Sequence, residues 1–291
     1  MNYVSCDIMG HLGRLGNQMF QYAFLIAYNN KHGNIPLINR NRKQMTGGDP
    51  LHKMVIDDCF DLTAEDINNH VGLSMQRKRE STHHYNPSFD MVQGNLDVVG
   101  YFQDERYFKE CSDVIRKEFT FKKEIQEQCD DIMKEFKKET VSVHIRRTDY
   151  LSLSEHHPIP SMSYFKKCME EFSSDVTYLI FSDDVQWCKE NFIGNNMIIQ
   201  ENNHFVDLCL MTMCDHNIIT NSSFSWWGAW LNPNPNKKVF FPSEWFGPAA
   251  SLNYRNGSGE FSMCPPEWNC IDVEDKSVPL PTYHPDSIKG L

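Results

Sequence analysis

The sequence has 291 residues, of which 40% are hydrophobic and 12% aromatic, enough for one large core or two of medium size. Its formal net charge of -11 repels a long polyphosphate over most of the surface, so nucleic-acid binding is not expected. A small phosphorylated ligand stays compatible with this charge, because it needs only one local group of positive side chains.

The first part of the chain begins with a strand-like stretch. A glycine-containing loop follows over Gly13–Gln18, and the apolar spacing of Met19–Tyr28 predicts a buried helix. Residues 39–95 are polar and poorly periodic, which indicates loops and short helices on a surface that can hold an acceptor.

Two charged segments come next, residues 105–119 and 122–138, and both have the spacing of amphipathic helices. We expect the domain junction within or just after them. The prediction is therefore an N-terminal domain over residues 1–130 and a C-terminal domain over residues 131–291.

The second half alternates short apolar strands with helices, as a parallel sheet with covering helices does. The predicted strands are residues 141–145, 177–181, 196–200, 217–220 and 239–242. The predicted helices are residues 162–172, a helix that closes at 190–192, and residues 205–214 and 225–231. Ligands bind such open sheets beyond the carboxyl ends of the strands, so polar residues there are candidates.

The ten cysteines form neither a C-x-x-C pair nor a zinc-type Cys/His spacing, so we expect reduced thiols and no metal site. The first residues lack the basic start and apolar stretch of a signal peptide, and nowhere do about 18 apolar residues run together. The expectation is a soluble, cytoplasmic protein without a transmembrane segment.

The first polar cluster is His144–Asp149, directly after a predicted strand. Two adjacent guanidiniums, Arg146 and Arg147, can clamp a pyrophosphate and neutralise the charge that develops when a leaving group departs. Solvated surface charges or structural salt bridges are the alternative. The position after an apolar strand favours the functional interpretation.

The second cluster, Ser182-Asp183-Asp184, also follows a strand. A carboxylate there can accept hydrogen bonds from a purine edge or from ribose hydroxyls. Asp183 and Asp184 are equally compatible with a helix N-cap or with an acidic metal-binding pair.

The third cluster, Thr220–Ser225, is a polar turn that opens an aromatic helix. Its hydroxyls and backbone N–H groups can hold phosphate oxygens at the positive end of the helix dipole. The alternative is a capping run before a core helix. The tryptophans that follow, Trp226, Trp227 and Trp230, are expected to be packing residues rather than sugar-stacking ones.

Together these segments resemble the alpha-1,2-fucosyltransferases of glycosyltransferase family 11. The matching stretches, which span most of the chain in the family's order, are Gly13–Ala23, Gly100–Gln103, His144–Asp149, Ile180–Asp184 and Asn217–Leu231. Alpha-1,6 and protein O-fucosyltransferases share the paired-arginine segment. It therefore argues for GDP-fucose more firmly than for any one acceptor.

The resemblance implies a GT-B fold, in which two Rossmann-like domains face a cleft. GDP-fucose would bind the C-terminal domain, a galactose-terminated glycan would approach from the N-terminal one, and no cofactor or metal would be needed. Arg146 would hold the β-phosphate with Arg147 in support. The other implied substrate-binding residues are His144 and Asp183 near the guanine, Asp184 after them, Ser222, Ser223, Phe224 and Ser225 around the nucleotide and diphosphate, and Asn17 and Gln18 facing the fucose.

The implied chemistry is a single inverting displacement, in which an acceptor hydroxyl attacks β-linked fucose while GDP leaves toward Arg146. Asp149 is the first candidate for the catalytic base and Glu155 the second, although Asp149 can equally serve to orient an arginine. A strongly dissociative transition state needs no base. Three alternatives stay open: an alpha-1,6 linkage, a metal-dependent transferase using Asp183 and Asp184, and a non-enzymatic glycan- or nucleotide-binding protein.

Overall fold

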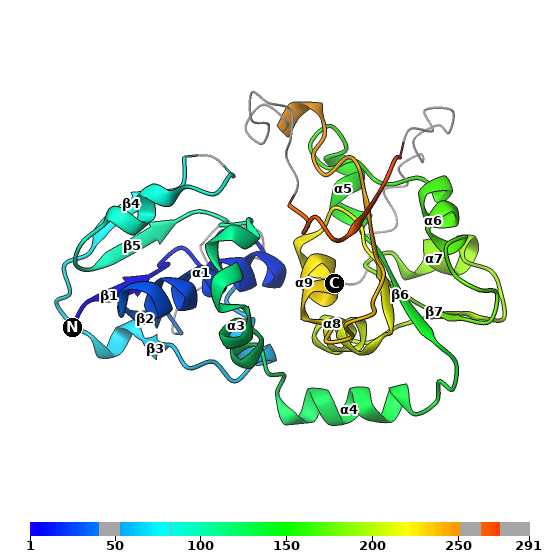
Figure 1. Cartoon of the computed structure of the whole chain (residues 1–291), viewed down its shortest axis with the longest axis horizontal. Helices are drawn as coiled ribbons and strands as arrows, with labels where there is room; N and C mark the ends of the chain where they lie inside the picture. The colour runs from blue at the N-terminus through cyan, green and yellow to red at the C-terminus, as the bar shows by residue number, and fades with distance from the viewer. Residues whose placement is uncertain (41–52, 82, 251–262, 274–291) are drawn as a thin grey trace. The chain divides into compact units, whose positions relative to one another are not determined.

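The computed structural model describes residues 1–40, 53–81, 83–250 and 263–273 (Figure 1). It divides into two compact units, Met1–Ile125 (unit 1) and Gln126–Leu291 (unit 2). The division and the sequence-based boundary at residue 130 both fall within one helix, α4 (Lys123–Met133). Among the described residues no helix is both long and apolar enough to span a bilayer.

Unit 1 contains one parallel sheet with the strand order β3-β2-β1-β5-β4. Its strands are β1 (Tyr3–Ser5), β2 (Ile35–Ile38), β3 (Glu65–Asp66), β4 (Gln76–Arg79) and β5 (Leu96–Val99). The register places Val4 between Pro36 and Leu96. The strand order reverses between β1 and β5, so the loops after these two strands lie together at one edge of the sheet.

The main helix of unit 1 is α1 (Leu15–His32), which packs on β1 and β2 (Figure 1). The helix predicted over residues 19–28 is confirmed, and it begins four residues earlier, so Asn17 and Gln18 belong to its first turn. It is apolar enough to be buried over most of its length. It ends at Gly33, whose φ of 73° lies in the left-handed region that glycine adopts without a Cβ penalty.

Residues 39–95 contain more strand than expected. Of this segment, residues 41–52 and 82 lie outside the described part of the chain. The remainder includes β3 and β4 besides the short helical elements α2 (Ile56–Cys59), η1 (Ile67–Asn69) and η2 (Pro87–Met91). The sequence of β4 is Gln-Arg-Lys-Arg at the edge of the sheet, so its pairing leaves no apolar alternation to detect.

The single helix predicted over residues 105–119 is wrong. The segment forms two 3₁₀ turns, η3 (Glu105–Tyr107) and η4 (Lys109–Cys111), before the helix α3 (Ser112–Glu118). Asp104 accepts a hydrogen bond from the Arg106 N–H and so caps a turn that ends at once. The next predicted helix, residues 122–138, stops at Met133, where the apolar face of α4 gives way to charged residues.

Unit 2 contains a six-stranded parallel sheet with the order β11-β10-β9-β6-β7-β8. Its strands are β6 (Thr140–Ile145), β7 (Thr177–Ser182), β8 (Met197–Ile199), β9 (His216–Ile218), β10 (Val239–Pro242) and β11 (Asn269–Ile271). All five predicted strands are confirmed. The chain reverses direction across the sheet between β6 and β9, which makes their carboxyl ends the switch point where open sheets bind ligands.

The helices of unit 2 cover both faces of the sheet. They are α5 (Thr148–Ser152), α6 (Met162–Met169), α7 (Val185–Asn191), α8 (His204–Met213) and α9 (Ser223–Leu231). Residues of α6 and α7 share one apolar core with β6 and β7. The helices α8 and α9 pack against each other (Figure 1), and the rings of Trp226, Trp227 and Trp230 pack together there, buried as expected.

Candidate functional site

The three polar clusters of unit 2 lie at one edge of its sheet. The neighbouring strands β9, β6 and β7 are parallel, and each carries one cluster just beyond its carboxyl end. Buried apolar strands hold the backbone in place up to Ile145, Ser182 and Ile218. The polar side chains therefore begin where the rigid sheet stops, as a preformed site requires.

Arg146 is held by two carboxylates. Its Nη2 lies 2.7 Å from Asp149 Oδ1 and its Nη1 lies 3.0 Å from Asp183 Oδ2, while 17% of the side chain is exposed. Burial alone would lower the pKa of Arg146, but the charges of Asp183 and Asp149 outweigh it and the pKa is raised. The guanidinium is thus a fixed positive charge with five N–H donors, two of which point at these carboxylates.

Arg147 is turned away from Arg146. Its Nε lies 3.0 Å from Asp184 Oδ2, its guanidinium lies 4.0 Å from the centre of the Trp187 ring, and only 6% of the side chain is exposed. A clamp made of two adjacent guanidiniums, as expected from the sequence, does not form. The geometry gives Arg147 a structural role and leaves one arginine for an anion.

The carboxylate oxygens of Asp183 and Asp184 contact donors of the protein itself. Asp183 accepts hydrogen bonds from the Arg147 N–H at 2.9 Å and from Thr148 Oγ1 at 2.5 Å, besides its contact with Arg146. Asp184 caps α7 by accepting the N–H of Trp187 at 3.2 Å. Over the described ranges, no three His, Cys, Asp or Glu side chains are grouped so that they could hold a metal ion. The pair therefore orients arginines and caps a helix.

The two base candidates differ in surroundings. Asp149 lies in the first turn of α5, paired with Arg146 and with 34% of its side chain exposed. Glu155 is an exposed residue in the following loop, and its main-chain oxygen accepts the Ala249 N–H at 3.0 Å. Asp149 therefore lies beside the fixed charge, whereas the contacts of Glu155 fix only its backbone.

Two aromatic residues of this site had no role in the sequence-based set. The ring of Tyr150 stacks on that of His157 with centres 4.6 Å apart, and the Arg146 guanidinium lies 5.7 Å from the Tyr150 ring. Tyr150 also donates its hydroxyl to the Asn221 main-chain oxygen at 3.0 Å, which ties the β6 cluster to the β9 cluster. A single tyrosine after an arginine pair gives no sequence signal for such a bridge.

His144 lies on the other side of the cluster, toward α9. Its Nδ1 is 3.2 Å from Thr220 Oγ1 and its ring centre is 5.6 Å from that of Phe224. Burial lowers the pKa of His144 to about 3, with Asp183 opposing the shift. The imidazole is therefore neutral at pH 7 and offers one donor and one acceptor nitrogen.

The N-terminus of α9 has no side-chain cap in the described part of the chain. Its N-cap residue Ser222 makes no side-chain cap hydrogen bond within the described structure, so the capping interpretation of this turn is not supported. Ser225 is fully buried and donates to the Ser222 main-chain oxygen at 3.3 Å. Ser223 and Phe224 are partly exposed. First-turn N–H groups without a cap are suited to bind an anion.

Asp207 is a further candidate that the sequence-based set lacked. It lies in the first turn of α8, where the only hydrogen bond to its carboxyl among the described residues is a long one of 3.4 Å from Asn202 Nδ2. Burial raises the pKa of Asp207 to about 7, and the Asn202 hydrogen bond opposes this. The helix α8 that carries this carboxyl packs on α9, which in turn carries Phe224 beside His144. A lone acid within an apolar helix was its only sequence signal.

In unit 1, the N-terminal part of α1 is hydrogen-bonded to the segment after β5. Gln103, after β5, donates its Nε2 to Asn17 Oδ1 at 2.6 Å. Gly13 has a φ of 86°, and a Cβ there would come within 2.0 Å of Asn17 Nδ2. Gln18 is fully buried, where its amide donates to the Lys53 main-chain oxygen and accepts two backbone N–H groups. Asn17 is thus partly exposed, and its side chain is held by Gln103. Gln18 instead ties the first turn of α1 to the segment at residues 53–56.

The turn that carries Gln103 is held by Glu80, which follows β4. Glu80 Oε2 accepts the N–H of Tyr101 at 2.8 Å and the N–H of Phe102 at 3.1 Å. Phe102 has a φ of 54°, the one positive value at a non-glycine residue within the described ranges. Burial raises the pKa of Glu80 to about 7 against these two hydrogen bonds. A strained turn beside a candidate ligand residue is typical of functional sites.

Two Rossmann-like units in one chain, each with a parallel sheet and a switch point, define the GT-B class of glycosyltransferase folds. Fucosyltransferase NodZ from Bradyrhizobium has this fold, with a TM-score of 0.53 at 14% identity over 78% of this chain and 92% of that one. A NodZ alpha-1,6-fucosyltransferase soaked with GDP-fucose gives a TM-score of 0.52 at 14% identity, over 81% and 97% of the two chains. The expected fold class is confirmed.

Sequence comparison gives the family. Residues 7–246 match the model of glycosyl transferase family 11. An Escherichia coli alpha-1,2-colitosyltransferase is 33% identical over 294 residues, which cover 89% of this chain and 97% of that relative. The galactoside 2-alpha-L-fucosyltransferase Sec1 of Mus musculus is 26% identical over 89% of this chain and 79% of its own length. The chain belongs to glycosyl transferase family 11.

Proposed function

We propose that the protein transfers L-fucose from GDP-fucose to a hydroxyl of a terminal galactoside, with inversion and in alpha-1,2 linkage. Family membership and the galactoside fucosyltransferase named above support this. The observation that carries the proposal is Arg146, a permanent charge fixed by two carboxylates beside the uncapped N-terminus of α9. Unit 2 would hold the donor and unit 1 would receive the acceptor.

The diphosphate is proposed to lie between Arg146 and the first turn of α9. The backbone N–H groups at Ser223 and Phe224 would bind its oxygens, and the free N–H groups of Arg146 would bind the β-phosphate. A helix terminus and a guanidinium supply positive charge where the leaving group becomes more negative. Stabilisation of that developing charge is the main catalytic contribution in this proposal.

The guanine is proposed to lie between the first turns of α8 and α9. Phe224 would offer a ring face, His144 a neutral imidazole, and Asp207 a carboxylate for the two neighbouring N–H donors of the guanine edge. Asp183 is a weaker candidate for this contact than the sequence indicated, because its oxygens already accept three donors.

Two roles for Asp149 stay in the proposal. As a base, it would accept the proton of the attacking hydroxyl through the oxygen that does not contact Arg146; as a positioning residue, it would keep Arg146 aimed. Asp149→Asn and Glu155→Gln separate these roles when transfer and donor hydrolysis are both measured. The proton of an attacking water can pass to bulk solvent, whereas the proton of a bound sugar hydroxyl passes to the base, so loss of transfer with retained hydrolysis identifies the base.

A second donor has specific support. The relative that is 33% identical over 89% of this chain is an alpha-1,2-colitosyltransferase, and colitose is L-fucose without its 3-hydroxyl. The diphosphate and guanine contacts proposed above are the same for both GDP-sugars. The discrimination therefore rests with the residues that touch the 3-position, and Asn17 is the candidate on unit 1.

The deciding experiment incubates the purified protein with a β-galactoside acceptor and either GDP-fucose or GDP-colitose, followed by linkage analysis of the product. An alpha-1,2-linked fucoside formed at higher kcat/KM than the colitoside supports the proposal. A reversed preference assigns the second donor. If neither GDP-sugar is transferred or hydrolysed, while the protein stays folded by circular dichroism, the proposed function is wrong.

A further inference from the structure

The side-chain amide of Asn17 is held in one orientation. Asn17 lies in the first turn of α1, and its Oδ1 accepts a hydrogen bond from Gln103 Nε2 at 2.6 Å. Its Nδ2 donates to no residue of the described ranges, and Asn17 is partly exposed. Because the oxygen is occupied, the two N–H donors are the part of this amide that can meet a ligand.

Gly13 gives this amide its place on the loop before α1. A Cβ on Gly13 would come within 2.0 Å of Asn17 Nδ2 and 2.5 Å of Asn17 Cβ, and the φ of 86° at Gly13 itself favours glycine. The amide therefore packs directly over the Gly13 backbone. With this backbone on one side and the Gln103 side chain on the other, Asn17 has little freedom to rotate.

Gln103 is carried by a strained turn. The residue before it, Phe102, has a φ of 54°, a value that a non-glycine residue keeps only where its surroundings enforce it. Glu80 enforces it here, because one of its oxygens, Oε2, accepts the N–H groups of both Tyr101 and Phe102. The turn thus fixes the place at which the Gln103 side chain leaves the backbone.

The loop before α1 and this turn are also joined by a buried bridge. Gln21, one helical turn after Asn17 and fully buried, donates its Nε2 to the main-chain oxygens of Leu12 at 3.1 Å and of Gly100 at 3.0 Å. The two segments are therefore connected without the help of Asn17. The second, partly exposed bond from Gln103 is not needed for that connection, and what it adds is the orientation of one amide.

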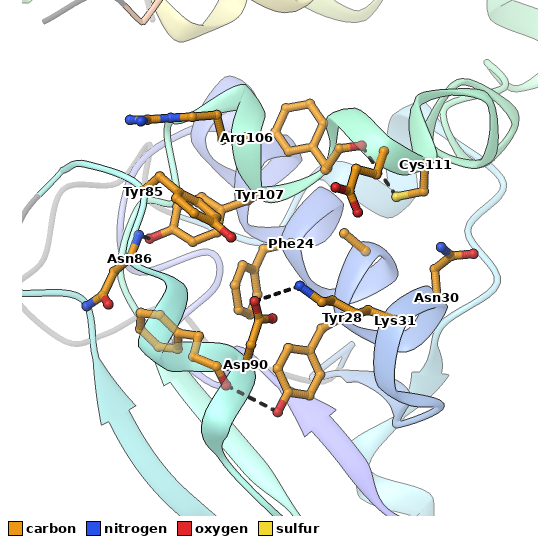
Figure 2. A pocket seen from close by; sticks show the side chains of 14 residues that line it. Phe24, Tyr28, Asn30, Lys31, Tyr85, Asn86, Asp90, Arg106, Tyr107 and Cys111 are labelled. Carbon is orange, nitrogen blue, oxygen red and sulfur yellow. Dashed lines mark hydrogen bonds and ion pairs between the residues drawn. The ribbon is translucent and has the colours of Figure 1, made fainter.

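The chain beyond Gln103 is anchored as well. Asp104 accepts the Tyr85 N–H at 3.0 Å, and the ring of Tyr107 stands edge-on to that of Phe24 in α1 at 5.3 Å (Figure 2). The pocket between these rings measures about 70 Å³, well below the ~300–1,000 Å³ of small-molecule sites, so we assign it no ligand. Its rings instead keep the segment that carries Gln103 attached to α1.

We propose that Gln103 is a positioning residue, which holds Asn17 Oδ1 so that the Asn17 N–H groups donate to a hydroxyl oxygen of the sugar being transferred. The inference rests on the proposed function, in which Asn17 faces that sugar, and adds Gln103 as a determinant of donor affinity. Gln103 itself touches no substrate. An Asn17 side chain without this bond would have to be ordered by the donor, at a cost in affinity.

The variant Gln103→Met tests this, because it keeps the length of the side chain and removes the donor. KM for GDP-fucose should rise about fivefold with kcat unchanged, as expected for a neutral hydrogen bond made equally in the ground state and the transition state. The inhibition constant of GDP, which has no sugar, and KM for the galactoside should stay within about twofold. The matched control is Gln76→Met, since Gln76 Nε2 donates to the Gln93 main-chain oxygen at 2.6 Å elsewhere in unit 1.

A double-mutant cycle shows whether Gln103 acts through Asn17. Asn17→Ala should raise KM for GDP-fucose at least as much as Gln103→Met does, and the double variant should match Asn17→Ala within about twofold. Three results would overturn the inference. They are effects that multiply in the double variant, a fall in kcat of Gln103→Met at unchanged KM, which assigns Gln103 to the fold, and wild-type kinetics of Gln103→Met.

NMR of the Asn17 side-chain amide separates this inference from the proposed function. Its signal is identified by its absence in Asn17→Ala. In the ligand-free wild type the amide should be as rigid as the backbone of α1, and in Gln103→Met it should become mobile on the ps–ns timescale. Equal mobility in the two proteins overturns the inference even where GDP-fucose is turned over. If no GDP-sugar is transferred or hydrolysed and the amide still responds as expected, the proposed function alone fails.

Discussion

Arg146 and Arg147 are adjacent in the chain, but we expect the replacement of each by alanine to have different effects on catalysis and on stability. Arg146→Ala removes the charge proposed to meet the leaving diphosphate, and we expect kcat of the folded protein to fall on the order of 10²–10³-fold, with some loss of stability because Asp183 and Asp149 lose their cation. Arg146→Lys keeps a point charge without the planar fork and should recover part of the rate. Initial rates of transfer, together with thermal unfolding, test this. Near-normal transfer by Arg146→Ala would remove the central assignment.

Arg147→Ala should behave differently. Its guanidinium is 6% exposed and pairs with Asp184 over the Trp187 ring, so its loss leaves a largely buried carboxylate unpaired. We expect the free energy of unfolding to fall by about 2–3 kcal/mol. Urea denaturation measures this, and GDP affinity of the folded fraction should stay near that of the wild type. A stable variant with lost GDP affinity would restore the two-arginine clamp.

Asp207 gives a pH prediction for donor binding. A guanine edge needs the ionised carboxylate, and burial raises the pKa of Asp207 to about 7 in the unliganded protein. Because the group is mostly protonated at pH 6 and mostly ionised at pH 8, GDP affinity should rise about tenfold between these values. Isothermal titration of Asp207→Asn is the comparison, since any pH dependence due to GDP itself persists in that variant.

The wild type and Asp207→Asn also test which group of the guanine Asp207 contacts. Inosine diphosphate lacks the 2-amino group of guanine, so wild type should bind it more weakly than GDP, and Asp207→Asn should lose most of that preference. Equal pH profiles in the two proteins would assign Asp207 to the fold.

Single residues of the site were only partly predictable from sequence. Arg146 and Ser222 follow buried strands and His144 is near the carboxyl end of one, and their place at the sheet edge follows from that pattern alone. Whether a polar residue faces a ligand or its own protein depends on partners far along the chain. Asp183 is an example, since its oxygens are taken by groups about 35 residues earlier. The structural roles of Arg147 and Gln18 became visible only with those partners.

At the scale of the element, the turn after β5 yields a stability prediction. Burial raises the pKa of Glu80 to about 7, above its unfolded value near 4.5, so the folded state binds more protons than the unfolded state between these pH values. The contribution of Glu80 to stability therefore falls as pH rises toward 7. Glu80→Gln removes this titration. The stability of wild type relative to the variant should drop by about 2–3 kcal/mol from pH 5 to pH 8.

Urea denaturation of both proteins at the two pH values measures this difference. A direct comparison is needed because burial also lowers the pKa of the neighbouring His83, to about 4, which acts in the opposite direction in both proteins. Parallel stability curves for wild type and Glu80→Gln would mean that Glu80 stays ionised in the folded protein.

The strands β6, β7, β9 and β10 of unit 2 were predictable because they are buried over most of their length, whereas the largely exposed β11 was not predicted. A run such as Tyr-Leu-Ile-Phe in β7 gives a continuous apolar signal that needs no partner to interpret. The opposite holds for β4, a polar edge strand that exists only because β5 offers it backbone groups. The prediction of one helix over residues 105–119, where η3 and η4 form, failed for a related reason. Their charged residues fit a helical period, but a side-chain cap at Asp104 ends the first turn.

For the whole molecule, the GT-B fold was inferred from the order of several motifs along the chain. No single element would have been enough for that inference. The motifs from both units had to occur in one chain for a two-unit donor and acceptor enzyme to be inferred. Each unit then shows the same device, a parallel sheet that reverses direction beside its candidate ligand residues. Motifs do not fix the acceptor, because the residues that contact an acceptor can be scattered across turns that have no common sequence pattern.

The last prediction concerns metal ions in the complete enzyme. Transfer should be unchanged, within about twofold, after treatment with EDTA, because Arg146 and the amides of α9 are proposed to supply the positive charge that a divalent cation provides elsewhere. Asp183 and Asp184 have arginines and backbone N–H groups as partners, and a cation would have to displace them. Activity lost with EDTA and restored by Mg²⁺ or Mn²⁺ would favour the metal-dependent alternative. Asp184→Asn should then abolish that restoration, whereas in the arginine-based proposal it lowers stability and leaves the response to EDTA flat.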